Sequence, residues 1–162
     1  KRYGKVAVVG LTSSVHGAAL LLQAECERLG VVLQIEIAES LQITGDAVRN
    51  EQVLINLLRN ALDAVEDAEE FTPRRVALSV VRDGEFALIC VRDSGPGIPD
   101  EVAAQLFAPF FTTKPSGKGL GLGLAISSSI VQAMRGQWSA HNLPEGGAEF
   151  QLRLALYSPL AK

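Results

Sequence analysis

The sequence predicts an α+β fold, in which a mixed and mainly antiparallel sheet packs on about three helices as a two-layer sandwich. Three observations lead to this expectation. One long amphipathic helix is expected before the middle of the chain, alternating apolar and polar residues mark about six or seven strands, and short turns join several strands as hairpins. The 162 residues are expected to form one domain that buries about two thirds of its unfolded surface.

The first quarter of the chain predicts one helix between strands. Residues 6–9 form a short apolar strand. Apolar positions then recur at helical spacing over residues 11–29, and Gly30 supplies a C-terminal stop. Residues 31–38 alternate between apolar and polar, and residues 41–44 continue in an extended pattern, so two further strands are expected.

Residues 47–67 form the clearest helix, with Asp46 as its expected N-cap. At about 100° per residue, Asn56, Asn60 and Asp63 fall together on a side away from the apolar stripe. Asparagine is a poor helix former in mid-helix positions. Two interpretations stay open: a solvated surface, or amide oxygens that face a ligand or a hydrated cation. The stripe consists of Val53, Leu54, Leu57, Leu58, Ala61, Leu62 and Val65.

Two strand pairs are expected in the second half. Residues 75–82 and 85–92 alternate on either side of Asp83-Gly84, which is a strong hairpin signal. Residues 137–142 and 148–156 form the final pair around a proline- and glycine-containing turn. The fold is therefore expected to contain hairpins rather than regular strand–helix–strand units.

Asp93 follows a predicted strand and opens a sharp turn with two glycines and a proline, over residues 93–98. A carboxylate accepts hydrogen bonds and cannot donate them. It would suit the exocyclic amine of adenine and repel the carbonyl that guanine carries there. Alternatively, Asp93 only caps the turn. A short helix is expected next, over residues 99–106.

Residues 106–124 combine three aromatic side chains, two lysines and glycine at every second position near the end. Such glycines let backbone N–H groups approach a ligand closely. A helix is expected over residues 125–134, so the last glycines lie at its N-terminus, where an anion is favoured. We expect a loop that closes over phosphates. The alternative is a flexible surface loop.

Common phosphate-binding motifs do not account for this segment. Gly117-Lys118 is followed by Gly119 rather than by Ser or Thr, which excludes a Walker A loop. The dinucleotide-binding fingerprint lacks its third glycine, and no protein-kinase catalytic loop is present.

Composition narrows the class of protein. Hydrophobic residues make up 48% and charged residues 20%, which is typical of a globular chain. A net charge of −3 gives no electrostatic reason to expect nucleic acid as a partner. No apolar run approaches the roughly 20 residues that a bilayer span needs, and no signal peptide opens the sequence. Cys26 and Cys90 lack metal-type spacing, so we expect reduced core thiols rather than a disulfide.

Together these motifs resemble the catalytic, ATP-binding domain of sensor histidine kinases, in the GHKL superfamily with its Bergerat fold. Four family boxes occur in order over nearly the whole chain. They are the N box Asn56-Leu-Leu-Arg-Asn60-Ala, the G1 box Asp93-Ser-Gly95-Pro-Gly97, the F box Phe107-Ala-Pro-Phe110-Phe111, and the G2 box Gly119-Leu-Gly121-Leu-Gly123-Leu124. The segments Asn60-Ala-Leu-Asp-Ala64, Phe111-Thr-Thr-Lys-Pro115 and Pro144-Glu-Gly-Gly147 are most similar to the C4-dicarboxylate transport and nitrogen sensors.

The resemblance implies a role for each matching position. Asn60 would hold Mg²⁺ through its amide oxygen, with phosphate oxygens and waters completing the octahedron. Asp93 would bind adenine, with Gly95 and Gly97 letting the backbone pass close to the base. Asn56 and Lys114 would be the catalytic residues. The phosphate contacts would come from Thr113, Lys114, Gly119, Leu120, Gly121, Leu122, Gly123 and Leu124, and the lid anchors would be Phe107, Phe110 and Phe111.

The resemblance also implies an activity and partners. The domain would bind Mg-ATP and donate the γ-phosphate to a histidine on an upstream dimerisation domain, for relay to a response-regulator aspartate. Residues 1–10 would be the remnant of the link to that domain. Neither His16 nor His141 lies in an acceptor-like sequence, so the isolated domain is expected to be inactive alone. The full-length protein would be an inner-membrane sensor with this domain in the cytoplasm.

Two alternatives stay open within the superfamily. A conformational ATPase clamp of the gyrase or chaperone type has a glutamate at the place of Asn56, where it activates water. A nucleotide-binding module without kinase activity would only transmit a signal. One departure from the family pattern concerns Ala148, where members often carry a threonine that makes a water-mediated adenine contact.

Overall fold

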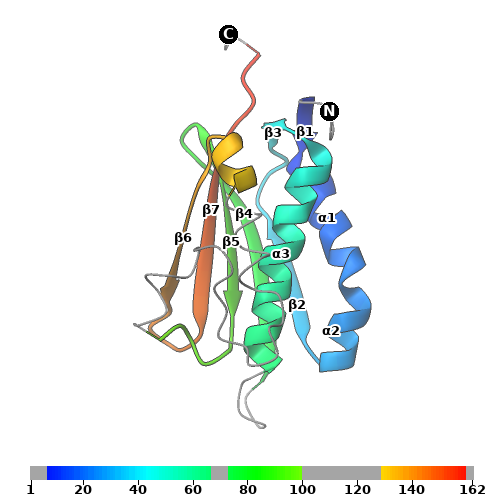
Figure 1. Cartoon of the computed structure of the whole chain (residues 1–162), viewed down its shortest axis with the longest axis vertical. Coiled ribbons are helices and arrows are strands. Elements are labelled where there is room, and N and C mark those ends of the chain that lie inside the picture. Colours follow the sequence, from blue (N-terminus) through cyan, green and yellow to red (C-terminus); the bar gives the residue numbers. More distant parts are fainter. Residues whose placement is uncertain (1–6, 67–72, 100–128, 160–162) are drawn as a thin grey trace.

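The computed structural model describes residues 7–66, 73–99 and 129–159. Its main sheet has five strands in the order β2-β4-β5-β7-β6, and a separate two-stranded sheet pairs β1 with β3 (Figure 1). The strands are β1 (Ala7–Gly10), β2 (Val32–Ile37), β3 (Gln42–Gly45), β4 (Arg75–Asp83), β5 (Phe86–Asp93), β6 (Gln137–Asn142) and β7 (Ala148–Ala155).

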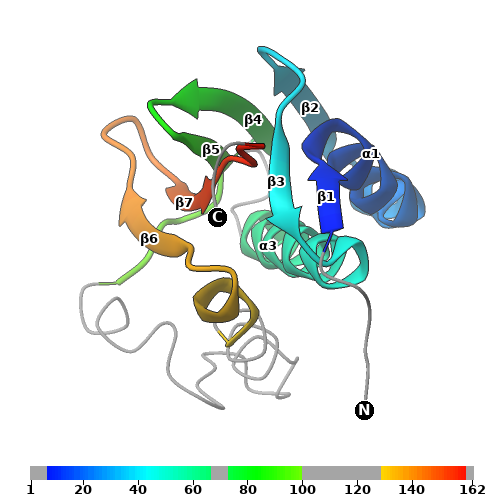
Figure 2. The same ribbon diagram turned by 90° about the horizontal axis from the view of Figure 1, so that it is seen from above.

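Helices cover one face of this sheet. Viewed from above, α1 (Leu11–Leu21) and α3 (Ala47–Glu66) lie on the same side of the five strands (Figure 2). All neighbouring strands of the main sheet are antiparallel except β2 and β4, which are parallel. The predicted α+β sandwich with a mixed, mainly antiparallel sheet is confirmed. The expectation of hairpins without strand–helix–strand units is wrong at this parallel pair, because β3 and α3 form a crossover between its strands.

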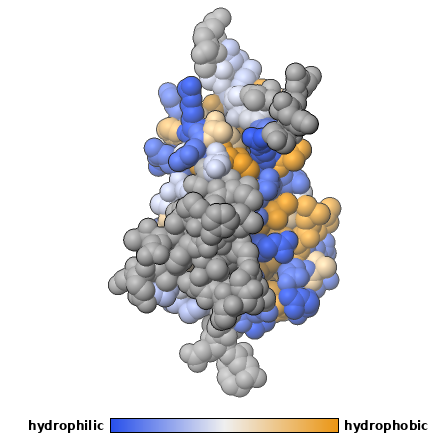
Figure 3. Space-filling view, in the orientation of Figure 1, coloured by the Kyte–Doolittle hydropathy of each residue, from blue (hydrophilic) through white to orange (hydrophobic). Residues whose placement is uncertain are grey.

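The helix predicted over residues 11–29 is divided in two. The structure has α1 followed by α2 (Gln23–Leu29), and Leu22 between them has φ −103° and ψ 6°. Buried apolar residues occur in both helices. The apolar periodicity therefore continues through Leu22 and does not indicate the break there. Leu20 and Leu21 at the end of α1 are exposed, and apolar surface is visible on the side of the molecule where α1 and α2 lie (Figure 3).

The helix α3 agrees with its prediction to within one residue at its end. Asp46 caps it as expected, because its Oδ1 accepts hydrogen bonds from the N–H groups of Val48 and Arg49 at 2.9 and 3.2 Å. Its apolar stripe is buried in the core. Asn50 is also fully buried, and neither side-chain atom has a hydrogen-bond partner among the described residues.

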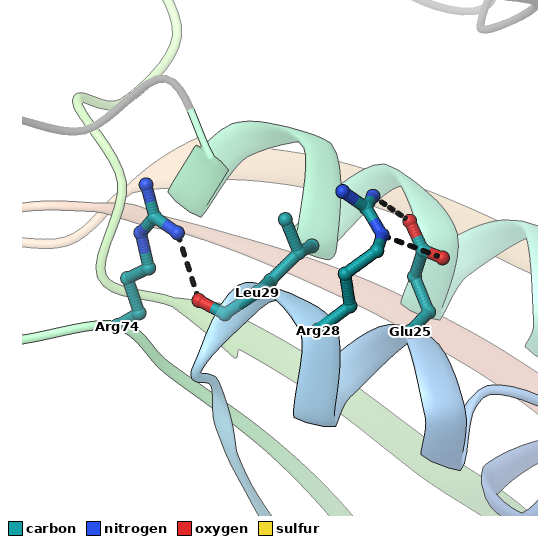
Figure 4. Close-up of polar contacts among 4 residues, drawn as sticks. All are labelled: Glu25, Arg28, Leu29 and Arg74. Atoms are coloured by element: carbon teal, nitrogen blue, oxygen red, sulfur yellow. Dashed lines mark hydrogen bonds and ion pairs between the residues drawn. The ribbon is translucent and has the colours of Figure 1, made fainter.

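Arg74 ties the C-terminal ends of α2 and α3 together. Its guanidinium donates to the carbonyl oxygen of Leu29 at 2.7 Å (Figure 4). It also donates to the carbonyl oxygen of Glu66 at 3.4 Å. A cation at these positions pairs with carbonyls that the helices leave unbonded. The pair Arg28–Glu25 on α2 lies at the surface, where ion pairs contribute little to stability.

The two strand pairs of the second half agree closely with their predictions. Gly84 turns the β4–β5 hairpin with φ +63°, and β6 has the predicted limits. Both cysteines are free and buried. Cys26 belongs to the hydrophobic core as predicted, whereas Cys90 lies outside the core cluster. The helix predicted over residues 99–106 lies outside the described residues, apart from Pro99. Of the predicted 125–134 helix, residues 129–133 are described and helical.

Candidate functional site: a buried carboxylate beside helix α3

Asp93 is the last residue of β5, and its side chain lies on the face of the sheet that α3 covers. The residue is 5% exposed. Its Oδ1 accepts hydrogen bonds from the N–H groups of Gly95 at 2.9 Å and Ala148 at 3.4 Å. Its Oδ2 accepts no hydrogen bond from the part of the chain that the structure describes. One oxygen therefore anchors the turn, and the other keeps its acceptor capacity for a donor from outside.

Burial raises the pKa of the Asp93 carboxyl above its ordinary value, although the two backbone N–H groups oppose the shift. None of the described cations forms an ion pair with Asp93, and its two backbone hydrogen bonds offset only part of the cost of burying its charge. A buried charged group that is only partly compensated is a candidate for a functional site. A ligand amine that donates to Oδ2 would supply the missing stabilisation.

The turn after Asp93 packs directly on α3. A Cβ atom at Gly95 would lie 2.7 Å from the carbonyl oxygen of Ala64 and 3.1 Å from Oδ1 of Asp93. Only glycine allows this approach, since real Cβ atoms do not come so close to a backbone oxygen. The contact brings the G1 turn to a point one helical turn beyond Asn60 on α3.

Asn60 is 8% exposed, so the alternative that places it on a solvated surface is wrong. Its amide has no hydrogen-bond partner among the residues that the structure describes. Its polar atoms are not among the fully enclosed ones of the described residues, so water, a ligand or a hydrated ion can reach the amide and complete its hydrogen bonds. Asn56 and Asp63, on the same side of α3, are half-buried, and each makes an interaction with the rest of the protein.

The residues around Asn60 supply too few ligands to hold Mg²⁺ by themselves, so they fit the ion only if a bound ligand also coordinates it. Within the described ranges, no group of three or more His, Cys, Asp or Glu side chains could hold a metal ion. Mg²⁺ is commonly bound through one or two protein oxygens, substrate phosphates and water. The single amide oxygen of Asn60 fits this arrangement, with phosphate oxygens as the other ligands.

The hairpin between β6 and β7 closes the other side of the turn. The sequence interpretation predicted this strand pair but did not connect it with Asp93. Asn142 hydrogen-bonds both backbone groups of Ile98, at 2.6 and 2.9 Å. Gly147 has φ +87°, and a Cβ there would lie 1.9 Å from the carbonyl oxygen of Asp93. An asparagine at the end of a predicted strand, followed by two adjacent glycines, was the available signal.

A second buried carboxylate, Glu149, occupies the opposite face of the sheet. Its carboxylate forms an ion pair with Arg92, lies 3.0 Å from Nε2 of His141 and accepts a hydrogen bond from Gln151 at 2.8 Å. Burial raises its pKa, but these partners outweigh that effect and hold the pKa below the ordinary value. The contact joins His141 of β6 to Glu149 of β7. The sequence interpretation did not identify Glu149 or Arg92.

A groove of about 400 Å³ borders the same strand ends. Gln34, Ala77 and Arg92 line it, and these residues pair across β2, β4 and β5 on the face away from α3. By contrast, the Asp93 carboxylate lies next to Ala64 on the helix side. Asp93, Ser94 and Gly95 nevertheless also line the groove, so it borders the same turn.

The phosphate-binding part of the predicted site lies outside the described residues. The structure accordingly brings together Asn60, Asp93 and Gly95 on one side of the sheet, with Gly97 in the turn beside Asn142. None of the described helices is long and apolar enough to span a membrane. The predicted residues that stay untested for this reason are Phe107, Phe110, Phe111, Thr113, Lys114, Gly119, Leu120, Gly121, Leu122, Gly123 and Leu124.

Comparison with known proteins identifies the family. Residues 45–158 match the family described as histidine kinase-, DNA gyrase B- and HSP90-like ATPase. The sensor histidine kinase TmoS of Ectopseudomonas mendocina is 39% identical over 154 residues, covering 93% of this chain and 16% of that protein. The C4-dicarboxylate transport sensor protein DctB of Pseudomonas aeruginosa is 36% identical over 147 residues, covering 90% of this chain and 24% of that protein. The chain thus spans a quarter or less of these relatives.

Solved structures give the same assignment. The catalytic domain of histidine kinase ThkA superimposes with a TM-score of 0.81 at 27% identity, covering 93% of this chain and 95% of that one. Full-length ShkA, solved in complex with AMPPNP, superimposes with a TM-score of 0.80 at 26% identity, covering 99% of this chain and 33% of that one. The chain belongs to the histidine kinase-, DNA gyrase B- and HSP90-like ATPase family, within which it is an ATPase domain of the two-component sensor histidine kinase type.

Proposed function

We propose that this domain binds Mg-ATP between α3 and the turn after Asp93, and donates the γ-phosphate to a histidine on a separate dimerisation domain of the same sensor kinase. A response-regulator aspartate would then receive the phosphoryl group. The observation that carries the proposal is the Asp93 carboxylate, which is buried without a cation and leaves Oδ2 available to a donor. The exocyclic amine of adenine is such a donor.

The metal assignment rests on Asn60. Its amide is nearly buried and has no partner among the described residues, and it lies one helical turn before the residue that contacts Gly95. Base and metal contacts would thus come from neighbouring positions. The ATP analogue AMPPNP in the complex of the related ShkA supports a nucleotide as the ligand. When bound, Mg²⁺ would neutralise charge on the phosphate oxygens.

The asparagine at position 56 favours transfer to a protein histidine over hydrolysis of ATP. An amide cannot take a proton from water, whereas a positioned general base typically contributes about 10²–10⁴ in rate. His141 is engaged with a buried glutamate, which makes it a poor acceptor. We therefore expect the domain alone to bind Mg-ATP and to remain nearly inert.

The sensed signal stays a prediction. DctB supports the dicarboxylate-sensor subtype, but relatives with other names match comparably: the two-component sensor PprA of Pseudomonas aeruginosa is 44% identical over 119 residues. We propose that the full-length protein is a membrane-bound sensor with this domain in the cytoplasm. Binding of C4-dicarboxylates by its sensory part would test the subtype.

The test is transfer of label from γ-labelled ATP to a separately supplied helical hairpin that carries the acceptor histidine of the full-length kinase. We expect acid-labile phosphohistidine on the hairpin, and none on a matched hairpin in which glutamine replaces that histidine. Hydrolysis by the domain alone at about 1 s⁻¹ would favour the clamp ATPase instead. ATP binding without transfer to the hairpin would favour a signalling module without kinase activity.

A further inference from the structure

Asn142 forms a two-point clamp on the turn that follows Asp93. It is the last residue of β6. Its Oδ1 accepts a hydrogen bond from the N–H of Ile98 at 2.6 Å, and its Nδ2 donates to the carbonyl oxygen of the same residue at 2.9 Å. The side chain thus pairs with Ile98 as a neighbouring strand would, at a point where the strands of the sheet have ended.

This clamp is the only hydrogen-bonded attachment of its end of the turn within the described ranges. The N-terminal end is held at Oδ1 of Asp93 by the N–H of Gly95 and by the packing of Gly95 on α3. Apart from the bonds to Asn142, residues 96–99 make no hydrogen bond to any described residue. Removing the Asn142 amide would therefore remove the described hydrogen bonds at one end of the turn, where the packing of Ile98 against the core remains, and leave those at the other end in place.

Gly97 makes the fit between clamp and turn specific. It has φ +92°, and a Cβ there would lie 2.9 Å from Oδ1 of Asn142. The backbone of Gly97 therefore passes directly beneath the clamping amide. Any shift of this amide changes the path of the chain between the carboxylate of Asp93 and Ile98.

We infer that Asn142 is a positioning residue of the nucleotide site, which sets base affinity and selectivity by holding the turn between Asp93 and Ile98. This inference rests on the proposed function, because it assumes that the turn binds adenine. The amide acts through Asp93 and Gly97, and needs no contact with the nucleotide. It assigns a function to the β6–β7 hairpin, which lies far from Asp93 in the sequence.

The experiment compares Asn142→Ala with Ser139→Ala, which changes an exposed serine on the same strand whose side chain makes no hydrogen bond with the described residues. ATP and GTP affinities are measured by competition for a fluorescent ATP analogue. We expect Asn142→Ala to weaken ATP binding about three- to tenfold, as for the loss of one or two modest hydrogen bonds. GTP binding should change less, so the ATP/GTP preference falls. Ser139→Ala should leave both affinities unchanged.

A second measurement separates positioning from general loss of structure. Amide exchange in the apo protein should accelerate at Ile98 in Asn142→Ala, while the amides in the middle of β5 and β7 keep their protection. Equal weakening of ATP and GTP, or unchanged ATP affinity, would overturn the inference. If the wild-type protein fails to bind ATP at all, the proposed function itself fails, which is a distinguishable result.

Discussion

Asp93 and Glu149 are both buried carboxylates on neighbouring strands, yet their surroundings differ. Glu149 is 2% exposed and is completed by Arg92, Gln151 and His141 on the outer face of the sheet. Asp93 is 5% exposed, lies on the helix face, and has two backbone N–H groups on a single oxygen. Burial raises the pKa of both groups, but the partners of Glu149 outweigh burial and leave its pKa lowered, whereas that of Asp93 stays raised.

The difference teaches how to separate a structural carboxylate from a functional one in this fold. A buried acid whose partners come from its own chain stabilises the folded state through those partners. A buried acid that keeps an open acceptor costs stability until a ligand completes it. Burial alone does not separate the two, and neither does hydrogen bonding alone. The informative quantity is the acceptor capacity that the protein leaves unused.

The largest expected effect comes from the glycine that lets β7 approach Asp93. In Gly147→Ala, the new Cβ would collide with the carbonyl oxygen of Asp93, and alanine disfavours φ +87°. We expect the free energy of unfolding to fall by at least about 3 kcal/mol. ATP affinity should fall as well, because the carboxylate is displaced. Urea unfolding and calorimetric titration measure the two effects.

Gly146 provides the matched control for this substitution. It also has a positive φ, +110°, but a Cβ there meets nothing within 4 Å. Gly146→Ala should therefore cost only the backbone strain, about 1–2 kcal/mol, and leave ATP affinity unchanged. Equal losses of stability in the two variants would show that the contact with Asp93 does not matter.

Glu149→Gln tests the structural carboxylate. It removes the charge but keeps the shape, and Arg92 is largely exposed, so solvent compensates part of the loss. We expect a destabilisation of about 1 kcal/mol at neutral pH. Because the folded pKa of Glu149 is lowered, its contribution is present above the ordinary carboxyl pKa and is lost as the pH falls through the folded value. Urea unfolding of both proteins at several pH values should show the difference vanish in acid. A difference that grows in acid would contradict this assignment.

Asn50 extends the comparison to a buried polar group that no ligand can reach. Its amide lacks partners among the described residues, as that of Asn60 does, but Asn50 is fully buried in the core. An unused polar group with no opening to the surface should be a cost without a function. The isosteric change Asn50→Leu is expected to raise the free energy of unfolding by about 1 kcal/mol. ATP affinity should not change, and a loss of affinity would place Asn50 in the nucleotide site.

Sequence patterns predicted the elements of the fold well, because period and turn chemistry are local. The α3 stripe, the Asp46 cap and the Gly84 hairpin all rest on residues within one turn or hairpin of each other. The parallel pairing of β2 with β4 depends instead on contacts across the chain, which the strand pattern does not contain. The break at Leu22 falls inside an uninterrupted apolar pattern, so periodicity could not locate it.

The residues of the candidate site likewise divide into those that local patterns identified and those that they missed. Asp93 and Asn60 were identified because each stands out in a short local pattern, to which the resemblance then assigned a role. Asn142 and Glu149 were missed because their partners are distant in the sequence. Ile98 lies 44 residues from Asn142, and Arg92 lies 57 residues from Glu149. No local pattern distinguishes a polar residue that clamps a distant turn from one that faces solvent.

The most direct test of the account is a calorimetric titration of Asp93→Asn with Mg-ATP, beside thermal unfolding of the apo protein. The amide oxygen of asparagine can still accept the hydrogen bonds from Gly95 and Ala148. The substitution removes a buried charge, and the raised pKa of Asp93 shows that this charge destabilises the folded state at pH values above the pKa. We predict that ATP affinity falls at least about tenfold, as for a lost charge-assisted hydrogen bond, while the apo protein unfolds at the same or a higher temperature near neutral pH. Unchanged ATP affinity with a less stable apo protein would show that Asp93, like Glu149, is a structural carboxylate, and would contradict the account.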